Sequence, residues 1–392
     1  MCFQAERGVE KKMKLIFASD SFKGSLTSEK TAELLTKAAN EIFGSCNTVS
    51  VPVADGGEGT MDAILKNRAG EKIFTYVHDP LMKPVRACYG NLEKGTAIVE
   101  MAKASGLVLV PERNRDPLNT TSYGTGELVR AVLDAGFKDV TISIGGSATN
   151  DGGMGFARAL GIRFLDKAGR ELDGRGEDLE KVRHIDMTGL NKNAADTSFT
   201  VMCDVKNPLC GPNGATLTYG QQKGGTPEIL ERLEAGMQNY REVLIHEFGI
   251  DPDKSEGTGA AGGLGAALKI FLKVEMKSGI ETVLDIIDFD MRLKEADLVI
   301  TGEGRCDHQS SCGKVVQGIG DRAKKQGVPV IALVGGLGEG YEKLYDHGIE
   351  SFFTTVDTPM ELSTAIEQAE RLYYQAAIRM FRTIKTGMLL KM

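Results

Sequence analysis

The sequence predicts an α/β protein with two domains, each of which contains a sheet. Short apolar segments typical of buried parallel strands alternate with helical segments at both ends of the chain, whereas closely spaced strands fill residues 73–101. The chain has 392 residues, and a single hydrophobic core rarely grows past about 250–300 residues. Similar outer segments around a different middle predict one domain built from both chain ends and a second domain inserted between them.

The N-terminal end has the expected alternation. KLIFASD at residues 14–20 is a short apolar run that ends in polar residues, as buried parallel strands do. Four apolar residues between Ala32 and Ile42 share one helical face, and Thr27 or Ser28 is available to cap that helix. VSVPV at residues 49–53 predicts the next strand, which a glycine loop and another helix follow.

The rest of the chain divides into a mixed middle and a regular C-terminal third. The middle predicts antiparallel strands and two helices, and the end repeats the strand and helix alternation. The predicted middle elements are strands within 73–101, a helix from about 122, a strand at 139–143 and a helix at about 227–248. The predicted later elements are strands near 297, 328 and 351, with helices after Gly313, near Leu337 and at the C-terminal end.

The predicted boundaries follow from this alternation. Residues 1–12 lack the apolar centre of a signal peptide and are expected to form a disordered leader. Residues 13–75 and 290–392 are expected to form the domain built from both chain ends. Residues 76–289 are expected to form the inserted mixed α/β domain.

Composition and charge exclude several classes of partner. The formal net charge is -7 and no cationic run is present, which argues against nucleic acid as a partner. No apolar stretch approaches the roughly 18 residues of a membrane helix. The seven cysteines show no spacing suited to zinc, and we interpret them as reduced thiols of a cytoplasmic protein. The 48 glycines, about 12% of the chain against an average of about 7%, indicate tight loops.

Five loops rich in glycine or acidic residues lie where a strand should connect to a helix, which is the usual position of ligands in α/β sheets. The first loop, DSFKGSLTS, carries Asp20, Ser21 and Lys23 before a helix start, where free amides attract phosphate or carboxylate. A turn with a solvated lysine explains the same residues. The second, VADGGEGT, suits magnesium or a hydroxyl-bearing substrate, and a surface turn is the alternative. Its candidate residues are Asp55, Gly56, Gly57 and Glu58.

The third loop, IGGSATNDGGMG, follows the predicted strand DVTIS. It offers a nest of backbone amides and hydroxyl groups for phosphate, and such density argues against a plain turn. Its candidate residues are Gly145, Gly146, Ser147, Asn150 and Asp151.

The fourth loop, GTGAAGGLGAAL, contains G-x-G-x-x-G but follows DPDKSE instead of a strand, so we reject a Rossmann dinucleotide site there. Gly259 in this loop either contacts a phosphate or packs closely against a helix. Asp204 in CDVKNPLCGPNGAT follows another predicted strand, and substrate binding and a turn role remain open for it.

The fifth loop, GEGRCDHQSSCGK, follows the predicted strand DLVIT. Glu303 and Asp307 are candidate metal ligands, and Arg305 and Lys314 are candidate partners of phosphate charge. Acids for a metal and cations for phosphate are the groups that phosphoryl transfer requires. The spacing does not match a P-loop, because His308 occupies the place of its first glycine.

The five loops and the segments SYGTGELVRAVLDAG and DVKNPLCGPNGAT, taken together in chain order, resemble the bacterial glycerate kinase family, type I. The resemblance covers the chain from about Met13 to the final helix. Cys306, His308 and Cys312 fill variable places of the family's pattern, whereas Asp307, Gln309 and Lys314 match it.

The resemblance implies a flavodoxin-like parallel sheet domain from both chain ends, an inserted restriction-enzyme-like mixed domain, and a cleft between them. It implies ATP and Mg2+ as cofactors and D-glycerate as the acceptor, in organic acid phosphorylation that feeds glycolysis. The product is expected to be 2-phosphoglycerate. 3-Phosphoglycerate and a related hydroxy acid such as tartronate remain alternatives, and the protein is expected to be a monomer or homodimer.

Roles within the candidate set remain open. Asp20 or Asp204 is the candidate base for the attacking hydroxyl group, although a loose phosphoryl transfer asks more of positioning than of proton removal. Lys23 and Arg305 are expected to hold a carboxylate or the moving phosphoryl group, and the amides of the third loop to hold phosphate. A sugar-acid sensor would keep the glycine loops without consuming ATP, and a hydroxy-acid reductase would need a strand before G-x-G-x-x-G.

Overall fold

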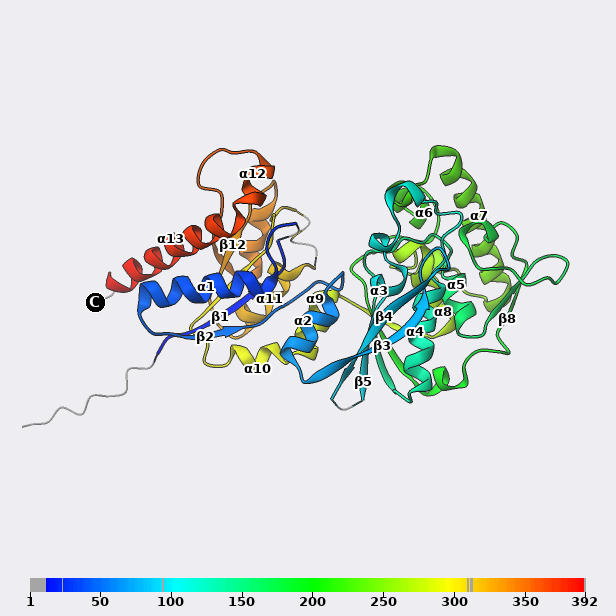
Figure 1. Ribbon diagram of the computed structural model, residues 1–392, viewed down its shortest axis with the longest axis horizontal. Helices are drawn as coiled ribbons and strands as arrows, with labels where there is room; N and C mark the ends of the chain where they lie inside the picture. Colours follow the sequence, from blue (N-terminus) through cyan, green and yellow to red (C-terminus); the bar gives the residue numbers. More distant parts are fainter. Residues whose placement is uncertain (1–11, 23, 94, 309, 311–312, 391–392) are drawn as a thin grey trace, which may run out of the picture. The chain divides into compact units, whose positions relative to one another are not determined.

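The chain forms two compact units in a computed structural model that describes residues 12–22, 24–93, 95–308, 310 and 313–390. Unit 1 consists of Met1–Asp55 and Val283–Met392, and unit 2 consists of Gly56–Thr282 (Figure 1). The predicted leader lies outside the described residues, apart from Lys12.

The joints between the units lie at residues 55/56 and 282/283, whereas the sequence placed them at 75/76 and 289/290. At the first joint, helix α2 (Thr60–Asn67) packs on strands of unit 2, and β3 (Gly70–His78) pairs along its length with β4 (Pro84–Leu92). At the second joint, helix α10 (Phe289–Leu293) packs on α11 (Val315–Lys325) of unit 1.

Unit 1 is built on a five-stranded sheet in which every pair of neighbours is parallel. Its strands are β1 (Lys14–Ser19), β2 (Asn47–Ser50), β11 (Leu298–Gly302), β12 (Val330–Val334) and β13 (Ile349–Thr354). The spatial order is β2-β1-β11-β12-β13. Counted along the chain this is the order 2-1-3-4-5, which is the flavodoxin-like arrangement. The α/β prediction for this part of the chain is confirmed.

Helices cover both faces of this sheet. Helix α1 (Ser28–Phe43) packs against α13 (Ala369–Leu389), and the two lie side by side in Figure 1. Their apolar faces form one core with alternate residues of β1 and β11, including Phe17 and Ile300. Helix α11 contacts β1, β11 and β12 but contributes nothing to that core, so it covers the opposite face. Thr27 caps α1 as predicted, since its hydroxyl group accepts a bond from the Lys30 amide.

Unit 2 is built on a six-stranded mixed sheet. Its strands β3, β4 and β5 (Thr96–Glu100) are antiparallel, as the sequence predicted for residues 73–101. Strand β5 then pairs in parallel with β6 (Asp139–Ser143), and the parallel part continues through β9 (Ser198–Met202) and β10 (Glu275–Lys277). A separate antiparallel pair consists of β7 (Arg163–Leu165) and β8 (His184–Asp186).

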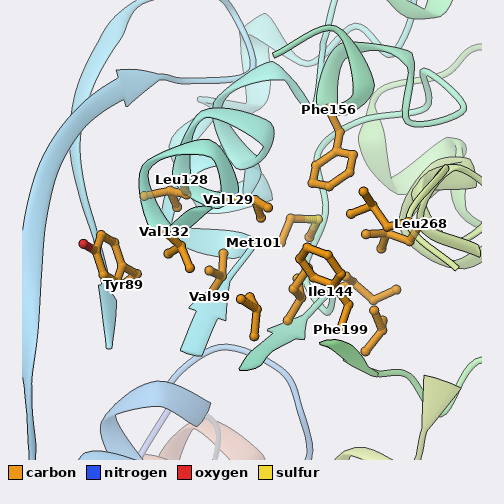
Figure 2. Packing of buried hydrophobic residues seen from close by; sticks show 14 of the residues in the cluster. Tyr89, Val99, Met101, Leu128, Val129, Val132, Ile144, Phe156, Phe199 and Leu268 are labelled. Carbon is orange, nitrogen blue, oxygen red and sulfur yellow. The ribbon is translucent and has the colours of Figure 1, made fainter. Parts of the chain in front are cut away.

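The core of unit 2 forms where α4 (Tyr123–Asp134) and α8 (Leu264–Phe271) meet this sheet. Figure 2 shows Leu128, Val129 and Val132 of α4 gathered near Val99 of β5, with Leu268 of α8 on another side of the cluster. A second cluster lies under α7 (Pro227–Phe248) and includes residues of α5 (Met154–Ala159). Shorter helices are α3 (Ala102–Ser105) and α6 (Ala215–Tyr219) in unit 2 and α12 (Leu362–Glu367) in unit 1. Helix α9 (Gly279–Ile286) contains the joint at 282/283.

Two predicted elements differ from the structure. The strand expected at residues 49–53 ends at Ser50, because Pro52 has no amide hydrogen to extend the ladder. The helix expected near Leu337 is a short 3-10 helix at Tyr341–His347 that follows a glycine-rich loop. Among the described residues, no helix is long and apolar enough to cross a membrane.

Candidate active site

The first candidate group lies at the carboxyl edge of the unit 1 sheet. Strands β1 and β11 are neighbours, and Ser19 lies opposite Gly302 at their ends. The Asp20 amide donates to the Gly302 carbonyl oxygen at 2.9 Å, which places Asp20 and Glu303 directly after adjacent strands. The helices that follow these strands cover opposite faces, so this is the switch point where open α/β sheets bind ligands.

Glu303 is held in place from two sides. Its side chain is buried, and one carboxylate oxygen accepts a bond from the Cys306 thiol at 3.3 Å. Its carbonyl oxygen accepts from the Gly335 amide at 3.1 Å. Burial raises the pKa of Cys306, and the Glu303 carboxylate adds to that effect, so this thiol remains protonated and serves as a donor.

Arg305 and Asp307 lie beside a second glycine loop. The Arg305 guanidinium is 3.6 Å from the Asp307 carboxylate and its side chain is 72% exposed, so it is free to reach an anion in solvent. The Cys306 amide donates to the Gly336 carbonyl, and the Gly338 amide donates to the Cys306 carbonyl. A Cβ atom on Gly338 would lie 2.9 Å from the Asp307 Cβ, so only glycine allows this close approach.

The remaining unit 1 candidates have simpler surroundings. Asp20 accepts a bond from the Ser21 amide at 2.6 Å and is partly buried. Lys314 occupies the N-cap position of α11 and is partly exposed. Asp55 is the last residue of the first unit 1 segment and is partly buried. Lys23 lies outside the described residues.

The second candidate group lies in unit 2, where the neighbouring parallel strands β5, β6 and β9 end. Gly57 lies so near the third loop that a Cβ atom on Gly145 would be 2.9 Å from its Cα. Gly56 has a φ of +89° and lies against Met202 at the end of β9. Two of the predicted loops therefore meet here, and the side chain of Glu58 beside them is exposed.

Asp151 is fully buried and its carboxylate organises the unit 2 group. It accepts bonds from the Ser122 amide at 2.7 Å, the Ser122 hydroxyl group at 2.8 Å and the amides of Gly153 and Gly155. Burial raises the pKa of Asp151, and these bonds oppose that effect. The Thr121 hydroxyl group is a fifth donor at 3.4 Å. All of these donors lie at or directly before the starts of α4 and α5, so Asp151 fixes the end of the third loop.

The other unit 2 candidates tie neighbouring loops together. Asn150 donates to the Thr216 hydroxyl group at 3.0 Å, and the Gly259 amide donates to the Asn207 carbonyl at 3.0 Å. A Cβ atom on Gly259 would lie 2.1 Å from the Pro208 carbonyl oxygen, so close packing explains why this position is a glycine. Asp204 is exposed and accepts a bond from the Gly279 amide at 3.1 Å.

Comparisons with known proteins identify the group to which these loops belong. The model of the glycerate kinase family matches residues 15–385. The chain belongs to the glycerate kinase family. A "Glycerate kinase" of Bacillus subtilis (strain 168) is 42% identical over 95% of this chain and 98% of that protein. The "Glycerate 2-kinase" of Escherichia coli (strain K12) is 42% identical over 96% of this chain and 99% of that protein.

A solved structure agrees with this assignment. The crystal structure of a protein assigned as glycerate kinase 2 from Salmonella typhimurium LT2 aligns with a TM-score of 0.85 and 41% identity. The alignment covers 97% of this chain and 100% of that chain. Membership of the glycerate kinase family makes the protein a kinase, and the resemblance that the seven sequence segments predicted is confirmed.

In this member of the glycerate kinase family, two buried polar residues were not predicted from the sequence. Glu100 at the end of β5 is buried, and its carboxylate accepts the amides of Gly59 and Met61 at the start of α2. Lys223 is buried beneath the third loop. Neither residue lies in a loop of unusual composition, although Lys223 precedes two glycines in YGQQKGG.

A cavity of about 610 Å3 lies beside α6 and α7, apart from the candidate residues. It is lined by Leu217, Gln221, Gly225, Pro227, Leu230, Glu231, Glu234, Ala235 and Gln238. None of these residues is among the predicted site residues. The cavity therefore does not coincide with the candidate loops.

The absence of a strand before the fourth loop is confirmed. The residues that precede Gly257 form a 3-10 helix at Pro252–Lys254. A dinucleotide site of the Rossmann type needs a strand there, because the strand delivers the glycines to the pyrophosphate. The reductase alternative therefore has no site in this part of the chain.

Proposed function

We propose that the protein transfers the γ-phosphoryl group of ATP to D-glycerate and that the product is 2-phosphoglycerate. The observation that carries this proposal is the near full-length likeness to kinases named for glycerate, one of which is a glycerate 2-kinase. Two groups of polar residues at strand ends support it, because phosphoryl transfer depends on positioning and on charge stabilisation.

The unit 2 group supplies donors for a phosphate or carboxylate. Among the described residues, the amides of Gly145, Gly146 and Ser147 donate to no other atom of the protein, which leaves them available to a ligand. Successive amides of this kind form an anion-binding nest. Asn150 and Asp151 are expected to keep this loop in shape through their bonds to neighbouring segments.

The unit 1 group supplies carboxylates suited to magnesium. Mg2+ prefers oxygen ligands and usually takes one or two carboxylates together with substrate phosphates. Among the described residues, no group of three His, Cys, Asp or Glu side chains has metal-binding geometry. Glu303 and Asp307 fit a magnesium site with two carboxylate ligands, in which phosphate oxygens and water complete the coordination of the ion. When bound, the ion would neutralise charge on the phosphates.

The residues that act on the hydroxyl group are proposed from their positions. Asp20 lies at the switch point of the unit 1 sheet and is the first candidate for the base, and exposed Asp204 is the alternative. Arg305, with its exposed guanidinium, and Lys23 are proposed to hold the substrate carboxylate or the moving phosphoryl group. Lys314 is proposed to stabilise phosphate charge at the start of α11.

The test is to incubate the purified protein with ATP, magnesium and D-glycerate and to identify the product by phosphorus NMR. We expect ADP and 2-phosphoglycerate. A 3-phosphoglycerate resonance would contradict the proposed position of transfer, and turnover of tartronate or a larger aldonate in place of glycerate would contradict the acceptor. Ligand binding without ADP release would indicate a sensor instead of a kinase.

The site is tested by single substitutions. D20N, K23M and D307N are each expected to lower kcat/KM by about 100-fold or more, because each removes a group that acts on the transferred phosphoryl or its acceptor. D346N removes an exposed carboxylate elsewhere in unit 1 and serves as the matched control, with kcat/KM unchanged. Wild-type rates in all three folded site variants would show that the site lies elsewhere.

A further inference from the structure

Lys223 occupies an unusual position in unit 2. Its side chain is only 2% exposed, and it belongs to a short 3-10 helix at Gln221–Lys223. Its ammonium group donates to the Ser147 hydroxyl oxygen at 2.8 Å and to the Thr149 carbonyl at 2.7 Å. Lysine is almost never fully buried unless it is paired with an opposite charge, so this arrangement needs an explanation.

No carboxylate within the described part of the chain forms an ion pair with Lys223. Asp151 is the anionic group that acts on it electrostatically, but its carboxylate already accepts bonds from Thr121, Ser122, Gly153 and Gly155. Arg115 packs with its backbone and Cβ against Gly224, the next residue along the chain, and supplies no negative charge. The buried ammonium group therefore lacks a direct counter-charge in the protein.

The contact with Lys223 leaves the hydrogen of the Ser147 hydroxyl group available. An ammonium group can only donate, so the Ser147 oxygen must accept and its own hydrogen is left for another acceptor. Ser147 is partly exposed, and the amides of Gly145, Gly146 and Ser147 donate to no described atom of the protein. The three amides and the Ser147 hydroxyl group can therefore donate to a ligand, and the Lys223 ammonium group favours a ligand that carries negative charge.

We propose that Lys223 is a positioning residue that supplies the positive charge of an oxyanion site formed by residues 145–147, and that it acts on the bound oxyanion through Ser147. The oxyanion is a phosphate of ATP or the carboxylate of glycerate, and the restriction to these two ligands rests on the proposed function. Both groups accept several hydrogen bonds and carry the charge that the buried ammonium group lacks.

The charge state of Lys223 gives the site a measurable signature. Burial lowers the pKa of Lys223 to about 7, and Asp151 opposes that effect. A bound oxyanion favours the charged form and raises this pKa. Binding near pH 8 should therefore be accompanied by proton uptake, and affinity should fall as the pH rises from 6.5 to 8.5, because more of the free protein then carries a neutral lysine.

The test is calorimetric titration of the full-length protein with ATP alone and with D-glycerate alone. At pH 6.5, K223M should weaken binding in at least one arm by about tenfold or more, because it removes a charge-assisted contact. The affected arm identifies the source of the oxyanion. K181M removes the charge of a partly exposed lysine of unit 2 and is the matched control, with both affinities unchanged.

The proton signature separates this role from a merely structural one. Titration at pH 8 in two buffers of different ionisation enthalpy should show proton uptake by the wild type in the affected arm. K223R should bind with little loss and without uptake, because arginine stays charged. If K223M does not fold, the proton uptake of the wild type decides the question.

Two results would overturn the proposal: folded K223M with both affinities within about twofold of the wild type, or no proton uptake in either arm at pH 8. Failure of the proposed function looks different. In that case the wild type would take up protons on binding an oxyanion but would not release ADP in the presence of D-glycerate.

Discussion

At the scale of single residues, the buried carboxylate of Asp151 shows how the third loop is held. Its hydrogen-bond donors join the starts of α4 and α5 to the end of the loop. Burying a charge is costly unless hydrogen bonds surround it, so these bonds allow the Asp151 carboxylate to lie in the interior. The loop that presents Gly145–Ser147 is therefore anchored at one end by Asp151 and from below by Lys223.

We expect D151N to destabilise the protein by about 3 kcal/mol, because one of the two carboxylate oxygens is replaced by an amino group that faces a buried donor. The measurement is the free energy of unfolding in urea. D196N, which changes an exposed carboxylate of the same unit, is the control and should be near neutral. An equal stability of D151N and wild type would show that the carboxylate is not needed to hold the loop.

Residue roles were the part of the site that the sequence predicted least completely. Asp151 was predicted as a binding residue from its place in a glycine loop, and only the structure shows that its carboxylate is enclosed. Lys223 was not predicted at all, because a lysine between polar and glycine residues usually lies at the surface. Its burial depends on contacts with Ser147 and Thr149, which are more than 70 residues away in the chain.

At the scale of elements, the start of α2 depends on an acceptor from the neighbouring sheet. Glu100 at the end of β5 accepts the amides of Gly59 and Met61 and lies 3.6 Å from the Lys103 ammonium group. The first amides of a helix have no partner within it, and a carboxylate there also interacts favourably with the helix dipole. Glu100 therefore connects α2, and the Gly57–Gly59 loop before it, to the sheet.

E100A should lower the free energy of unfolding by about 2 kcal/mol, because two amides and a lysine lose their buried partner. E100Q keeps one acceptor oxygen and should lose less. The measurement is thermal unfolding, with E71A on the exposed part of β3 as the control. If E100A and E71A unfold at the same temperature, the helix start is satisfied by solvent.

Elements with strong local patterns were predicted well from the sequence. The strands before the first, third and fifth loops, the antiparallel strands of unit 2 and the cap of α1 are confirmed. Predictions failed where local patterns are short or ambiguous. Strands β7 and β8 were not predicted, since three-residue strands are too short to show a periodicity.

At the scale of the whole molecule, the hydrophobic clusters follow the division of the chain. Two clusters lie wholly within unit 2, and one is formed by both segments of unit 1. The parallel sheet of unit 1 needs both segments, because β11 is the neighbour of β1. The sequence predicted this arrangement of two ends around an insertion, whereas the joints depend on which sheet α2 and α10 pack against.

Unit 2 should therefore fold when residues 56–282 are expressed alone, because its sheet and both of its clusters come from one continuous segment. We expect a single cooperative transition in urea, as for other compact domains, and dispersed NMR amide signals. The fragment should show no glycerate kinase activity, since Asp20 and Glu303 belong to unit 1. A matched fragment of residues 76–289, which lacks α2 and most of β3, should be less stable because β4 keeps its pairing with β5 but loses most of its pairing with β3. A fragment of residues 56–282 that binds hydrophobic dyes and unfolds without a cooperative transition would show that unit 2 depends on unit 1 for its core.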